Sequence, residues 1–147
     1  METSKQTDII NDLILINNDR IVGYEKAIEN IKEDDANLTS FFQERKIESE
    51  TFKSELKGKI APNLVEEGTT NAGKIYRAWM DVKAFFVGDD KKGILKSCEG
   101  GEDAAMVAYN HALETEELEP EVRSLIESQH EKIKTAHDKV NGMIEML

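Results

Sequence analysis

The stretch that decides the fold class is residues 8–31, DIINDLILINNDRIVGYEKAIENI. Its residues recur on one face at alternating spacings of about four and three, which is the period of an amphipathic α-helix. The members of this face are Ile10, Ile14, Asn17, Ile21, Tyr24, Ile28 and Ile31. With Asp8 as its capping residue, we predict a first helix over residues 8–33.

The same period recurs along the rest of the chain and predicts helices over 36–58, 72–87, 89–116 and 119–147. The acidic pair Asp34-Asp35 separates the first two helices, and negative charge stabilises a helix N-terminus. Pro120 falls in the first turn of the last helix, where proline is tolerated. No segment has the alternating pattern of a strand, so the sequence predicts an all-α chain.

The lengths of the connections predict the topology. Short links join 8–33 to 36–58 and 89–116 to 119–147, so each pair should be antiparallel. About 30 residues separate the second long helix from the third, which is far more than a tight turn needs. This segment, with its own helix over 72–87, is long enough to return along the bundle. We therefore expect a ferritin-like four-helix bundle with a long helical crossover, formed as one domain by residues 1–147.

Composition limits the functional classes. The chain has 147 residues, a formal net charge of −11, 39% apolar residues and one cysteine, Cys98. An acidic surface repels nucleic acid and anionic lipid, so neither is an expected partner. No signal peptide and no apolar run of about 20 residues is present, which indicates a cytoplasmic protein.

Each long helix interrupts its apolar face with polar residues. They are Asn17 and Tyr24, Arg45 and Ser49, Glu102 and Tyr109, and Gln129. At about 1.5 Å per residue, Tyr24, Arg45 and Glu102 should share one level of the bundle, and Asn17 and Tyr109 another. A buried carboxylate needs a partner, and we expect Arg45 to pair with Glu102. These residues predict a buried polar layer of Asn17, Tyr24, Arg45, Glu102 and Tyr109, with a ligand or metal pocket as the alternative.

Segments 17–27, 76–84 and 98–105 read NNDRIVGYEKA, YRAWMDVKA and CEGGEDAA, and residues 136–138 read AHD. Together they resemble a bacterial family of uncharacterised ferritin-like four-helix-bundle proteins. The resemblance extends over essentially the whole chain. It implies a ferritin-like fold and no particular activity, because a fold supports many functions.

Ferritin-like dimetal proteins hold iron or manganese with one Glu on each of two helices and a Glu-x-x-His on each of the other two. The resemblance places Glu127 and His130 in one such motif and Glu102 at a single-Glu position. Asn17 stands where the other single Glu is expected, and the helix carrying Arg45 has no histidine. A complete dimetal site is therefore not predicted. One divalent ion (Fe, Mn or Zn) on Glu102, Glu127 and His130 is the candidate metal site, with Glu99 or His137 as further ligands.

Three functions follow from these patterns. The leading hypothesis is a non-catalytic structural, binding or stress-associated protein that forms a homo-oligomer, and no catalytic residue is predicted. The second is a metal-binding protein or oxidoreductase that uses the partial carboxylate and histidine site. The third is an interaction module in which the 72–87 helix, with Trp79 and Phe85-Phe86, contacts a partner that the sequence does not identify.

Overall fold

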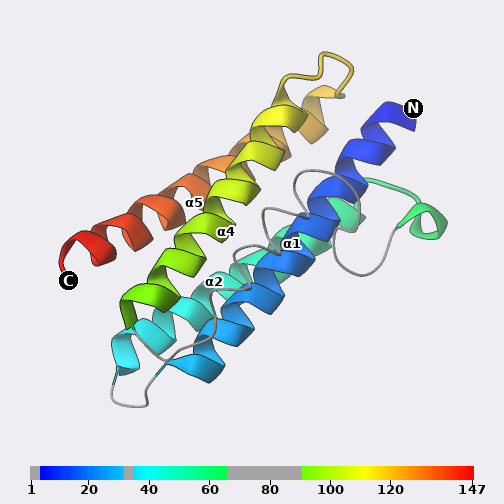
Figure 1. The fold of residues 1–147 in the computed structure, drawn as a ribbon. Helices are drawn as coiled ribbons and strands as arrows, with labels where there is room; N and C mark the ends of the chain where they lie inside the picture. Colours follow the sequence, from blue (N-terminus) through cyan, green and yellow to red (C-terminus); the bar gives the residue numbers. More distant parts are fainter. Residues whose placement is uncertain (1–3, 32–34, 66–90) are drawn as a thin grey trace.

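The computed structural model describes residues 4–31, 35–65 and 91–147, and these ranges fold into α-helices with no strand (Figure 1). The all-α prediction is confirmed for them. The predicted helix over 72–87 lies outside the described residues. Within the described ranges, no helix combines the length and the apolar character needed to cross a membrane. The helices are α1 (Ser4–Asn30), α2 (Ala36–Lys57), the short 3-10 helix η1 (Pro62–Leu64), α4 (Lys91–Leu113) and α5 (Pro120–Glu145).

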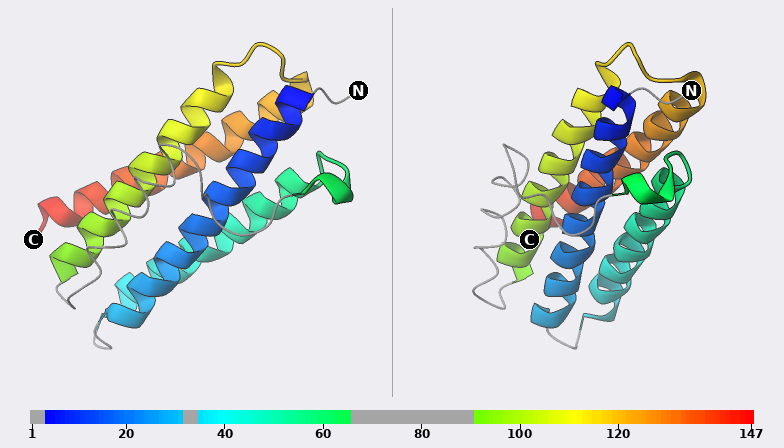
Figure 2. Two further views of the ribbon diagram at one scale, coloured as in Figure 1. Left: turned by 45° about the vertical axis from the view of Figure 1, so that its right-hand side comes forward. Right: turned by 90° about the vertical axis from the view of Figure 1, so that its right-hand side faces the viewer.

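The four long helices lie side by side as two antiparallel pairs, α1 with α2 and α4 with α5 (Figure 2). The pairs are joined mainly through α1, which also packs on α4, whereas α2 and α5 touch only slightly. The Nζ atom of Lys91 lies 2.6 Å from Oδ2 of Asp35, so α2 and α4 begin at the same end of the bundle. These two helices therefore run in the same direction.

Local chemistry accounts for the helix ends. The N-cap residue of α2 is Asp35, whose side chain accepts a hydrogen bond from the backbone N–H of Leu38 at 3.0 Å. Helix α5 begins at Pro120, one residue after the predicted start, and this proline lies in its first turn as expected. The expectation for α1 is wrong, because this helix begins at Ser4 and Asp8 lies inside it. Pattern alone places a helix end only to within a few residues.

Two side chains of α1 form hydrogen bonds to connecting segments at the other end of the bundle, away from Asp35 and Lys91. Oε1 of Gln6 accepts a hydrogen bond from the backbone N–H of Glu119 at 2.7 Å, which joins the start of α1 to the start of α5. Nδ2 of Asn11 donates to the backbone carbonyl of Leu64 at 2.8 Å, which joins α1 to η1. Polar groups of α1 thus satisfy backbone groups of two connecting segments.

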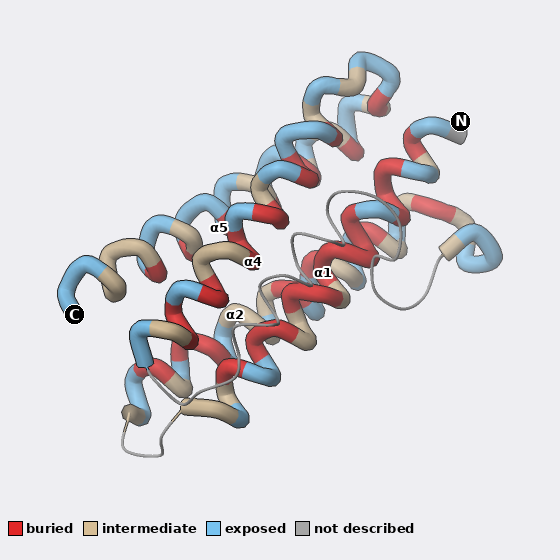
Figure 3. Tube along the Cα trace, in the orientation of Figure 1, coloured by how far each residue is buried: buried red, intermediate tan, exposed pale blue. Residues whose placement is uncertain are grey.

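The apolar core is divided into two clusters. In α1, the residues of the first cluster end at Ile16 and those of the second begin at Tyr24, and Arg20 lies between them. On α4, Glu102 lies between Cys98 of the second cluster and the alanines of the first. Burial extends nearly all round the middle of α1 (Figure 3). A layer of polar side chains therefore crosses the bundle between the two apolar clusters.

Candidate functional site

The centre of the bundle holds the guanidinium of Arg20, whose side chain is completely buried. Its Nε donates to Oε1 of Glu102 at 2.6 Å, and its Nη2 donates to Oε2 of the same carboxylate at 2.7 Å. This two-point contact is the strongest geometry that an arginine and a carboxylate form. It joins α1 directly to α4. We call the set Arg20, Tyr24, Glu48, Ser49 and Glu102 the Arg20 network.

Glu102 is also completely buried, so each lone pair of its carboxylate has to be satisfied inside the protein. Besides the two bonds from Arg20, Oε2 accepts a hydrogen bond from the hydroxyl of Tyr24 at 2.9 Å. Both oxygens are therefore engaged by donors from α1. Three of the roughly four lone-pair sites of this carboxylate are occupied in this way.

Helix α2 completes the coordination of the guanidinium. Nη1 of Arg20 donates to Oγ of Ser49 at 2.9 Å, and Nη2 donates to Oε1 of Glu48 at 2.9 Å. Ser49 is fully buried, whereas the side chain of Glu48 is 17% exposed. The network thus extends from the centre of the bundle to the edge of solvent, and it contains side chains of three helices.

Burial and charge act together on the ionisable groups of this network. Burial disfavours the charged form of Arg20, but the adjacent carboxylate of Glu102 outweighs it and raises the pKa of Arg20 above its ordinary value. Burial, followed by the negative charge of Glu102, raises the pKa of Tyr24 well above 10.0. The same two causes raise the pKa of the thiol of Cys98, which is a buried residue of the second apolar cluster.

A second polar set lies toward the first apolar cluster and centres on Tyr109. The hydroxyl of Tyr109 donates to Oε1 of Gln129 at 2.6 Å and accepts from Nδ2 of Asn17 at 2.9 Å. Nε2 of Gln129 donates to the backbone carbonyl of Phe52 at 3.2 Å and to Oε1 of Glu55 at 3.1 Å, which fixes the direction of the chain of hydrogen bonds. Burial raises the pKa of Tyr109, although the hydrogen bond from Asn17 acts in the opposite direction.

Six of the seven polar residues singled out in the sequence lie in these two sets and are buried, namely Asn17, Tyr24, Ser49, Glu102, Tyr109 and Gln129. Arg45 is the exception. Its Nε lies 3.7 Å from Oε1 of Glu48, and its guanidinium carbon lies 5.0 Å from the ring centre of Phe41. The side chain of Arg45 is 14% exposed, and its predicted ion pair with Glu102 is replaced by that of Arg20.

The reason for this correction is the packing of the helices. Helix α1 packs on α4, whereas α2 packs mainly on α1, so an arginine of α1 is the one that reaches Glu102. The pattern on α1 placed Ile21 on the buried face, but Ile21 is only partly buried and Arg20 is completely buried. Arginine is seldom buried unless it is paired, so residue type alone favoured Ile21 over Arg20 for the buried face of α1. The sequence did contain one signal for Arg20: it precedes Tyr24 by four residues, which places the two side chains on the same face of α1.

The candidate metal ligands do not form a site. Glu127 is exposed on α5, whereas Glu102 is buried and accepts three hydrogen bonds within the Arg20 network. His130 is partly buried, and its Nε2 has no hydrogen-bond partner in the described part of the chain. His137 instead contacts Asp103, with Nε2 2.7 Å from the carboxylate. Across residues 4–31, 35–65 and 91–147, no group of three or more His, Cys, Asp or Glu side chains is placed to hold a metal ion.

The model of one protein family, a domain of unknown function (DUF2383), matches residues 5–116. The chain belongs to this family. The match includes almost all of α1 together with α2 and α4, and therefore every member of the Arg20 network; Gln129, His130 and the rest of α5 lie beyond it. A search of curated proteins finds no match to the chain. Membership of DUF2383 brings no activity with it, so the function has to be argued from the site.

Replacing Arg20 with methionine is expected to lower the free energy of unfolding by about 3–5 kcal/mol, because the buried carboxylate of Glu102 loses its cation. The double variant Arg20→Met/Glu102→Leu should recover a large part of this loss, since it also removes the stranded charge. Urea denaturation of both variants and of Glu102→Leu measures the coupling.

Arg45→Met is the matched control for that experiment. The side chain of Arg45 is 14% exposed and its nearest carboxylate oxygens are 3.7 Å away, so its removal strands no hydrogen-bonded carboxylate and should lower the free energy of unfolding by less than the Arg20 variant does. Equal losses for the two arginine variants, or a fully additive double-mutant cycle, would contradict the assigned pairing.

Tyr24 and Tyr109 are expected to stay protonated in the folded protein at alkaline pH, because the pKa of each is raised by burial. The unfolded chain releases these protons near pH 10, so this contribution to stability is complete below that pH and is lost as the pH rises above it. Tyrosinate absorbance and far-ultraviolet circular dichroism, recorded together during an alkaline titration, should therefore change together. Ionisation of both residues with the helical circular dichroism signal intact would show the expectation to be wrong. The double variant Tyr24→Phe/Tyr109→Phe identifies the part of the tyrosinate absorbance that comes from these two residues.

Proposed function

We propose that this DUF2383 protein is a non-catalytic structural or binding protein of the cytoplasm, in which a ferritin-like bundle keeps a buried ion pair in place of a dimetal centre. The observation that carries the proposal is the guanidinium of Arg20, which is completely buried and makes four hydrogen bonds to side chains of α2 and α4. A cation could bind Glu102 only in competition with this guanidinium, which already donates to both carboxylate oxygens.

The ligand chemistry supports the same conclusion. Dimetal centres of ferritin-like proteins need carboxylates that are free to coordinate metal from four helices. Here both oxygens of Glu102 accept hydrogen bonds from α1, and the side chain of Asn17 contributes an amide to the hydroxyl of Tyr109. The residues present do not fit a pair of metal ions. The ferritin-like topology itself, with a crossover between α2 and α4, belongs to this proposal, and it agrees with the common starting end of those two helices.

Metal analysis tests the proposal. Protein purified without chelator, and then incubated with Fe(II), Mn(II) or Zn(II) and desalted, is expected to retain far less than one equivalent of any metal. Its thermal unfolding midpoint should not change with these ions, because binding to the folded state alone would raise it. Stoichiometric metal that is lost in a His130→Ala variant would overturn the proposal in favour of a metal-binding protein. His111→Ala, which changes an exposed histidine, is the matched control.

Self-association is the second element of the proposal. Ile47 on α2 and Val107 on α4 are 61% and 60% exposed, so large aliphatic side chains are available on the outer faces of two helices. In size-exclusion chromatography with light scattering, we expect a mass above the 16.6 kDa of one chain, and a lower mass for an Ile47→Lys/Val107→Lys variant. A single-chain mass for the unmodified protein across a wide concentration range would exclude self-association.

A further inference from the structure

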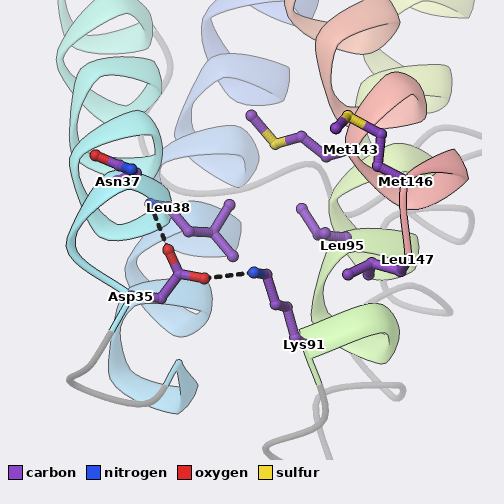
Figure 4. A pocket seen from close by; sticks show the side chains of 8 residues that line it. All are labelled: Asp35, Asn37, Leu38, Lys91, Leu95, Met143, Met146 and Leu147. Atoms are coloured by element: carbon purple, nitrogen blue, oxygen red, sulfur yellow. Dashed lines mark hydrogen bonds and ion pairs between the residues drawn. The ribbon is translucent and has the colours of Figure 1, made fainter.

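We draw no further inference here: the strongest candidate, the open hollow at the end of the bundle where α2 and α4 begin and α5 ends (Figure 4), has its Lys91 already paired with Asp35 at 2.6 Å, and nothing in the described part of the chain shows what would occupy it.

Discussion

The buried ion pair of Arg20 and Glu102 is the interaction on which the rest of the structure depends. Removing a guanidinium and a carboxylate from water costs several kcal/mol for each ion, and only close pairing with complete hydrogen bonding offsets that cost. Here both side chains are completely buried, and the carboxylate accepts two bonds from the guanidinium. Sliding α1 along α4 by one turn would separate the charges inside the core. The pair therefore fixes the register of these two helices, which apolar packing alone would define less strictly.

The same pair organises the apolar core around it. Two clusters of buried apolar side chains lie on either side of the polar layer, and a tyrosine stands at each boundary. Tyr24 donates its hydroxyl to Glu102, and Tyr109 donates to Gln129. Each ring packs among apolar residues while its hydroxyl satisfies a polar neighbour, the usual role of a buried tyrosine. The two polar sets thus include residues of all four long helices, and Arg20 and Glu102 are paired within them.

This arrangement also bears on where the protein can bind other molecules. In the part of the chain that the structure describes, the carboxylate at the bundle centre is bonded to Arg20 and Tyr24, and no group of three or more His, Cys, Asp or Glu side chains is placed to hold a metal ion. Membership of DUF2383 does not identify a binding site, since a family can retain a fold while its sites change.

The sequence by itself determined the four long helices and their approximate ends, because a period of 3.6 residues depends only on local geometry. It also singled out Asn17, Tyr24, Glu102 and Tyr109, since polar residues on an apolar face stand out in any helical pattern. Only the tertiary structure decided that Arg20, and not Arg45, meets Glu102. That choice depends on which helices are neighbours and on how each helix is rotated about its axis. Rotating α1 by the angle between consecutive residues would put Ile21 in the place of Arg20. Local periodicity carries no information about a contact between residues 82 positions apart.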